Sequence, residues 1–314
     1  MLKPLLRKAA QAVPVILIVA VLAFLLLQLL PGDPAQAIAG SDATPEAVAR
    51  IRTQLGLDRS LPEQLARWLW GLAQGDFGKS LTLSQPVLTA VGERLPITLS
   101  LTFMSMALTL PLGVGLGMAA AYWRGTWIDG AVMFAALIGL SVPGFWIGIL
   151  AIILFSVILG WVPSGGYIPI AQGFGPWFSA LILPAVVLAL FQIGFLARMT
   201  RSAMLDILDQ DYIRAARARG VGELWTIVRH AFRNALITVV TVSGIILSLL
   251  ISGSVIIEQV FSLPGIGRLV VQGIMARDYP LVQGTMLLFG FAFVVVNLVI
   301  DVLYTLVDPR VRTD

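Results

Sequence analysis

The stretch LITVVTVSGIILSLLISGSVII, residues 236–257, contains no charged side chain and no proline. A helix needs about 20 mostly apolar residues to cross the hydrocarbon core of a bilayer, and this stretch supplies them. Over the whole chain 58% of the residues are hydrophobic, 12% are charged, and the mean hydropathy is +0.92. A chain of 314 residues cannot bury that many apolar side chains in water. The sequence therefore predicts an all-α membrane protein.

Five further windows on either side of this stretch have a similar length and apolar character: residues 9–30, 97–122, 131–159, 179–199 and 281–306. The first could be a cleavable signal peptide, because basic residues precede it and the sequence AQA at 35–37 resembles a cleavage site. Its apolar run from Val13 to Leu30 is longer than the usual signal-peptide core of about 7–15 residues, which favours a membrane span. We predict a polytopic protein with six transmembrane helices.

The distribution of positive charge predicts the orientation of these helices. Six spans place both termini on one side, and the basic residues near both ends and in the segment 200–235 then share that side. The loop 160–178 carries no charge, and 259–280 carries only two arginines, Arg268 and Arg277. Because short cytoplasmic loops are enriched in Lys and Arg, we predict that both termini and the segment 200–235 are cytoplasmic. The long segment 31–96 then lies outside.

The segment 31–96 carries helix signals of its own. Thr44, Pro45 and Glu46 are typical of a helix start, and this helix is expected to end near Gly56. A second helix is expected from about Ser60 to Gly75. One face of that helix holds the apolar residues Leu65, Trp68, Leu69 and Leu72. These patterns predict a small helical cap on the outer side.

The sequence AQGDFGKS at 73–80 nearly matches the phosphate-binding loop G-x-x-x-x-G-K-[ST], with Ala73 in place of the first glycine. A phosphate-binding loop follows a strand and opens a helix. Here the preceding stretch reads as a helix, and the charge bias places the segment outside. We therefore reject a nucleotide site, and we expect Lys79 to be a surface residue.

Several chemistries are excluded by composition. The chain has no cysteine and one histidine, which excludes thiolate metal sites, cysteine nucleophiles and multi-histidine metal sites. The middles of the six windows contain no ionisable residue, and Glu258 and Asp301 lie near span ends, within reach of water or a partner. Ion-coupled transporters and intramembrane enzymes usually place such groups deep in the bilayer. The source of energy is therefore expected outside this chain. Nucleic-acid binding is also disfavoured, because the basic residues lie between spans.

The segment DYIRAARARGVGELWTIVRHAFRNAL, residues 211–236, is basic and rich in alanine. We expect one short helix with Tyr212, Ala215, Ala216 and Arg219 on one side, ended by Gly220. A second helix is expected from Glu223 to Ala235, with Leu224, Ile227, Val228 and Ala231 on a common face. The pair could dock into a protein cleft, or it could lie on anionic lipid.

The Ala215–Ala216 pair followed by Gly220 resembles the EAA loop in the membrane subunits of ATP-binding-cassette importers. In that family the loop is a coupling helix that sits in a cleft of the cytosolic ATPase. Arg214 stands where the family pattern has Glu, and HAFRNAL at 230–236 resembles the H-A-L-R-N-A-L of the peptide-importer branch. The resemblance implies a docking loop formed by Arg214, Ala215, Ala216, Arg217, Gly220, Val221 and Leu224.

Six further motifs look like the B-type permease subunit of dipeptide and oligopeptide importers: LLPGDP at 29–34, LGLDRSLPEQ at 55–64, GDFGKS at 75–80, PGIGRL at 264–269, RDYPLVQG at 277–284 and DPRVR at 308–312. The resemblance implies a non-catalytic subunit without cofactor or metal in a bacterial inner membrane. Its implied partners are a second, C-type permease subunit, two cytosolic ATPase subunits and a periplasmic substrate-binding protein. The importer substrate could also be a nickel chelate, glutathione or a glycan, and the different-class alternatives are a self-contained channel and a membrane scaffold.

The resulting domain assignment follows the chain. We expect a first transmembrane helix at 1–30 and a periplasmic cap at 31–96. A five-helix permease core follows at 97–308, with the cytoplasmic coupling loop at 200–235, and a cytoplasmic tail occupies 309–314.

Overall fold

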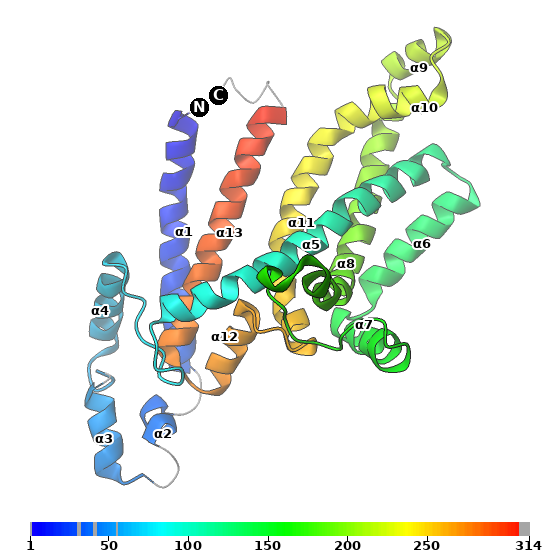
Figure 1. Ribbon diagram of the computed structural model, residues 1–314. Coiled ribbons are helices and arrows are strands. Elements are labelled where there is room, and N and C mark those ends of the chain that lie inside the picture. The colour runs from blue at the N-terminus through cyan, green and yellow to red at the C-terminus, as the bar shows by residue number, and fades with distance from the viewer. Residues whose placement is uncertain (1, 30–32, 40–42, 55, 308–314) are drawn as a thin grey trace. The chain divides into compact units, whose positions relative to one another are not determined.

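The computed structural model describes residues 2–29, 33–39, 43–54 and 56–307 (Figure 1). This part of the chain is almost entirely helical, which confirms the predicted all-α class. The extended pairing within it is a single bridge between Lys79 and Pro86. The chain divides into two compact units, one formed by residues 1–96 with 265–295 and the other by 97–264 with 296–314.

The first unit, called unit 1 below, combines the N-terminal part of the sequence with the segment 265–295. Its helices are α1 (Leu2–Leu29), α2 (Pro34–Ala39), α3 (Pro45–Gln54), α4 (Leu61–Ala73), the first turns of α5 (Val87–Tyr122), α12 (Ile266–Met275) and most of α13 (Tyr279–Val307). A small core forms where α5 begins and where α12 and α13 meet, from Val87, Ala90, Val91, Ile266, Leu269 and Leu281.

The two helices predicted in the segment 31–96 are present as α3 and α4. Helix α3 begins at Pro45, with the amide of Ala47 donating to the Thr44 hydroxyl at 3.4 Å. Helix α4 begins after Ser60 and is followed by a turn in which Gly75 has φ +80°. The four apolar residues expected on one face of α4 are half-buried, and α4 packs on α1. The short helix α2 was not predicted.

The second unit, called unit 2 below, holds the large apolar core. Its elements are α5, α6 (Trp127–Ser141), α7 (Gly144–Ala151) with a π-helical continuation (Ile152–Ile158), α8 (Phe174–Leu208), α9 (Asp211–Ala218), α10 (Glu223–Trp225), a π-helical stretch (Thr226–Ala231) and α11 (Phe232–Val260). Helix α8 packs on both α6 and α11. Leu181, Leu188, Leu196, Ile246 and Leu250 are among the buried side chains of this contact.

Four helices in the described part of the chain are long and apolar enough to cross a membrane: Val87–Tyr122, Phe174–Leu208, Glu223–Val260 and the Tyr279–Val296 part of α13. Together they correspond to four of the six predicted windows. Helix α1 contains an apolar stretch, Val13–Leu25, which is shorter than these four helices. The total of six spans stays a prediction.

The predicted window 131–159 is not one straight helix. Helices α6 and α7 meet at a bend of more than 40°. Only the two together are long and apolar enough to cross a membrane. The break lies at Val142, which is extended at φ −97° and ψ 128°, and at Pro143, which precedes α7. A residue before proline is driven out of the helical region by the proline ring, so the sequence Val-Pro-Gly ends α6 here.

Candidate functional site: the loop between α8 and α11

Helix α9 ends as the sequence predicts. Gly220 has φ +81°, a left-handed conformation that side-chain-bearing residues rarely adopt. The amide of Gly220 donates to the carbonyl of Arg217 at 2.9 Å, and the amide of Val221 donates to that of Ala216 at 3.3 Å. This pair of bonds is the Schellman arrangement, which satisfies the free carbonyls at a helix end. Gly220 therefore fixes the direction in which the chain leaves α9.

The inner side of α9 rests on the chain's own apolar core. Ile213 is fully buried and Ala216 is 2% exposed. Ile213 packs in one cluster with Ile227 and Ala231, and with Met204 and Leu208 near the end of α8. The sequence pattern grouped Ala216 with Ala215, but the structure buries Ala216 and leaves Ala215 exposed. Ala216 supports the loop from within.

The outer side of the loop exposes several large apolar side chains beside its charged residues. Tyr212, Leu224, Trp225 and Val228 are all exposed, and Leu224 has the largest exposed fraction, 69%. The sequence predicted one common face for Leu224, Ile227, Val228 and Ala231. The structure divides these residues, because Ile227 and Ala231 point inward while Leu224 and Val228 are exposed.

The second predicted helix does not end at Ala235. The helical chain runs from Glu223 to Val260, with the π-helical stretch Thr226–Ala231 inside it. The sequence shows no glycine or proline between Glu223 and Leu236, so nothing there stops the helix. The second half of the loop therefore continues without a break into the apolar helix α11.

Charged contacts hold the two halves of the loop together. Arg217 donates to both Glu223 carboxylate oxygens, from Nε at 3.0 Å and from Nη2 at 2.6 Å. The hydrogen bonding of Arg217 to the Glu223 carboxylate is the main cause that raises the pKa of Arg217. Asn234 Nδ2 donates to the Tyr212 hydroxyl at 2.8 Å, which links the start of α9 to α11. Arg217 therefore forms an ion pair with Glu223 within the loop.

A second ion pair joins α6 to the end of α8, close in sequence to the loop. Arg201 Nε donates to Asp129 Oδ1 at 2.5 Å, and Arg201 Nη2 donates to Oδ2 at 2.7 Å. Asp129 is 6% exposed, and the amide of Gly125 also donates to it at 3.1 Å. Sequence reasoning missed this pair. The position of Asp129 at the start of an apolar helix was the available signal, since a carboxylate there needs a cationic partner.

The segment AQGDFGKS has none of the surroundings of a phosphate-binding loop. Helix α4, not a strand, precedes it, and a turn follows Ser80 before α5 begins at Val87. Lys79 is exposed, as predicted. Ser80 is buried and donates to Asp278 at 2.6 Å.

Glu258 is more enclosed than its position near a span end suggested. It is fully buried, and the hydroxyl of Thr98 donates to its Oε1 at 2.6 Å. The Thr98 hydroxyl thus supplies one of the hydrogen bonds that a buried carboxylate needs. Asp301, the other acidic residue near a span end, lies outside the residues whose side chains are described.

The sequence compares with a known family over almost its whole length. Residues 113–313 match the family described as the binding-protein-dependent transport system inner membrane component. Residues 1–102 match the N-terminal region of the same type of membrane component. The chain belongs to this family. It is accordingly a permease subunit of an ATP-binding-cassette transporter, a class of membrane subunit that is not itself the catalyst.

Named relatives align with the chain from end to end. A chain of Brucella abortus (strain 2308), named as a peptide transport system permease, is 60% identical over 310 residues, which cover 99% of both chains. The glutathione transport system permease GsiC of Salmonella paratyphi A is 43% identical over 312 residues, again 99% of both. Among solved structures, the inward-facing MetNI methionine transporter has a chain with a TM-score of 0.59 at 22% identity, covering 70% of this chain and 97% of that one. That likeness supports the fold.

Proposed function

We propose that this chain forms half of the translocation pathway of an ATP-driven importer for peptides. A second, C-type permease subunit supplies the other half, and two cytosolic ATPase subunits supply the energy. A periplasmic substrate-binding protein delivers the peptide, and the pathway opens alternately to the two sides. The membership in the family and the end-to-end match to permease subunits support this assignment.

The peptide class is favoured by the names of two relatives. One is named for peptide transport and the other for glutathione, which is itself a tripeptide. A nickel chelate or a glycan remains the alternative for the same architecture. The ligand carried by the substrate-binding protein that co-purifies with this subunit would identify the substrate, and a bound nickel chelate or glycan would contradict the peptide assignment.

The observation that carries the coupling role is the two-sided construction of the loop between α8 and α11. Its inner side is buried against the chain's own core, while Tyr212, Leu224, Trp225 and Val228 are exposed. In this proposal the outer side sits in the ATPase cleft, with Arg214, Ala215 and Leu224 in contact with the partner. Ala216, Arg217 and Gly220 keep the loop in shape, and Val221 follows the turn. Because α11 continues directly from the loop, a movement of the ATPase would be passed to an apolar core helix.

The proposed arrangement in the membrane has six spans with α1 as the first. Both termini and the loop between α8 and α11 face the cytoplasm, and residues 31–96 lie in the periplasm as a cap. The excess of basic residues in the segment 200–235 supports this orientation. The membrane is then the bacterial inner membrane.

The docking proposal is tested by enlarging an exposed alanine of the loop. Ala215→Leu adds bulk where the ATPase would make contact, so we expect loss of ATPase co-purification and of dipeptide uptake in the same cells. Ala66→Leu is the matched control, because Ala66 is an exposed alanine of α4 in the other unit. A loop that lies only on lipid would tolerate the added apolar group. Normal assembly and uptake with Ala215→Leu would therefore contradict docking, and uptake without ATP would favour the channel alternative.

A further inference from the structure

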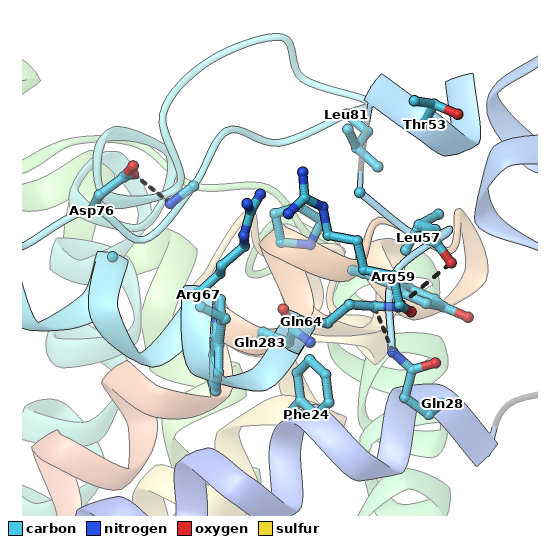
Figure 2. Close-up of a pocket in the computed structure, with 16 residues that line it drawn as sticks. Phe24, Gln28, Thr53, Leu57, Arg59, Gln64, Arg67, Asp76, Leu81 and Gln283 are labelled. Atoms are coloured by element: carbon cyan, nitrogen blue, oxygen red, sulfur yellow. Dashed lines mark hydrogen bonds between the residues drawn. The ribbon is translucent and has the colours of Figure 1, made fainter. Parts of the chain in front are cut away.

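Unit 1 contains a pocket of about 420 Å³ lined by residues of α1, the end of α3, the loop between α3 and α4, α4 itself, the turn after α4 and the start of α13 (Figure 2). Small-molecule sites are typically pockets of about 300–1,000 Å³ with an apolar lining and a few convergent polar groups. The apolar part here includes Phe24 and Tyr279, which are 4% and 9% exposed. Trp68 packs beside Phe24 with 5.9 Å between the ring centroids. The pocket therefore has an aromatic wall.

Two arginines provide the positive charge of this pocket. Figure 2 shows the guanidinium groups of Arg59 and Arg67 pointing to the same side, away from Phe24. Within the described ranges of the chain, neither guanidinium forms an ion pair or a hydrogen bond. Asp76 is the acidic residue of the lining, and its Oδ1 accepts a hydrogen bond from the amide of Gly78 at 2.8 Å. Two arginines against one aspartate leave the pocket with an excess of one positive charge.

Two polar groups of the pocket make no hydrogen bond within the part of the chain that the structure describes. Gln283 is 6% exposed, and its side-chain amide makes no hydrogen bond to any residue that the structure describes. Trp68 Nε1 is likewise buried without a partner in the described chain. Gln64 differs, because its Nε2 already donates to the carbonyl of Arg59 at 2.9 Å. The Gln283 amide, which lines the pocket, is therefore available to a polar group of a ligand.

We propose that this pocket binds a small organic carboxylate with an apolar or aromatic body. The guanidinium groups of Arg59 and Arg67 hold the carboxylate, because a planar guanidinium fork matches the two carboxylate oxygens. The Gln283 amide hydrogen-bonds a polar group of the ligand, and the ring of Phe24 contacts its apolar body. Arg59 lies in the stretch LGLDRSLPEQ and Gln283 in the stretch RDYPLVQG. The proposed transport mechanism assigns no role to either stretch.

A monoanion suits this pocket better than a phosphate. The excess of one positive charge balances a single carboxylate, whereas Asp76 would repel a doubly charged phosphate about twice as strongly as a monoanion at the same distance. The aromatic wall adds apolar contact area that inorganic phosphate cannot use. The terminal carboxylate of a peptide has this chemistry, but the assignment does not depend on what the transporter carries, because it concerns binding to this chain.

The experiment measures binding to the full chain in the assembled transporter, reconstituted in lipid nanodiscs. The probes are N-acetyl-phenylalanine, its uncharged amide and inorganic phosphate, each followed by equilibrium dialysis. We expect saturable binding of the acid, with the amide and phosphate weaker by about tenfold or more, the loss typical of one charge-assisted contact. Arg59→Gln and Arg67→Gln should each weaken binding of the acid by a similar factor. Gln283→Leu should also weaken it.

Arg50→Gln is the matched control, since Arg50 is an exposed arginine of α3 that does not line the pocket. Binding to this variant should equal that of the unchanged chain. Equal affinity for the acid and its amide, competition by phosphate as strong as by the acid, or no saturable binding of the acid would each overturn the proposal. The comparison of acid and amide uses the unchanged chain, so its result stands even if an arginine variant assembles poorly. None of these outcomes depends on transport.

Discussion

Ser80 Oγ donates a 2.6 Å hydrogen bond to Asp278 Oδ2, although 198 residues separate the two along the chain. The same carboxylate oxygen accepts from the amide of Thr82 at 2.9 Å and from its hydroxyl at 2.8 Å. Oδ1 accepts from the amide of Leu281 at 3.2 Å, at the start of α13. Asp278 is fully buried, so these donors replace its water. The bonds tie the turn after α4 to the junction of α12 and α13 within unit 1.

We expect Asp278→Asn to destabilise unit 1 by about 2–3 kcal/mol, because an amide replaces a buried charge that accepts four hydrogen bonds. Ser80→Ala removes one donor and should cost less, about 1–2 kcal/mol. Asp58→Asn is the control, since Asp58 is exposed. Thermal unfolding of the chain in detergent measures all three. Equal unfolding temperatures for Asp278→Asn and Asp58→Asn would contradict a stabilising role.

The near-match to a phosphate-binding loop is explained by this contact. The Ser80 hydroxyl donates its hydrogen bond to Asp278, and the Lys79 side chain is exposed. Neither residue is therefore positioned to bind a phosphate. We expect no specific labelling of Lys79 by a photoreactive ATP analogue, and unchanged uptake with Lys79→Ala. Labelling that excess ATP prevents would refute this interpretation.

Two glycines of α5 show where close packing limits substitution. A Cβ added at Gly117 would lie 2.6 Å from the carbonyl oxygen of Ala197, which is far inside contact distance. A Cβ added at Gly115 would meet nothing within 4 Å. We therefore expect Gly117→Ala to cost about 1–3 kcal/mol through forced separation of α5 and α8, while Gly115→Ala is close to neutral. The yield of folded chain and its unfolding temperature report the difference, and similar values for the two variants would count against the packing.

The helical class and most apolar windows could be predicted because hydropathy reports them directly. The break at Pro143 was harder to predict, because proline also occurs inside the continuous helix α8, at Pro184. What separates the two is context: Val142 leaves the helical region in front of Pro143, while α8 continues through its proline.

The candidate site was predictable in place but not in orientation. Gly220 signalled the end of α9, and its left-handed conformation agrees. Ala215 and Ala216 look alike in sequence, and only the packing of Ile213 and Ile227 determines which side is buried. The pairs Arg201–Asp129 and Ser80–Asp278 join distant segments. The position of Asp129 signals that it needs a cationic partner, but a single sequence does not show which residue that partner is.

The orientation in the membrane gives a separate prediction. An alkaline phosphatase, active only outside the cytoplasm, should be inactive when fused after residue 314 because the charge bias places that end inside. The same reporter fused in the uncharged loop 160–178 should be active. Activity of the C-terminal fusion would contradict the six-span arrangement.

The Arg217–Glu223 pair allows the shape of the proposed coupling loop to be tested apart from its outer surface. Both side chains are partly exposed, at 39% and 46%, so the pair should contribute only about 0.5–1 kcal/mol to stability. Its effect on coupling should be larger, because Arg217 fixes the angle between α9 and the helix that begins at Glu223. We expect Arg217→Glu to leave insertion normal but to lower substrate-stimulated ATP hydrolysis by the assembled transporter.

The reversed pair, Arg217→Glu with Glu223→Arg, restores the attraction and should recover most of that hydrolysis. Gly220→Val serves as the reference for a loop whose shape is lost, and its ATP hydrolysis should stay low. The strain of a valine at φ +81° cannot be relieved by a charge elsewhere. If Arg217 instead contacts an acidic group of the ATPase, the reversed pair will stay inactive because the cation has moved. Recovery in the reversed pair therefore assigns Arg217 to the loop itself, and failure assigns it to the partner surface.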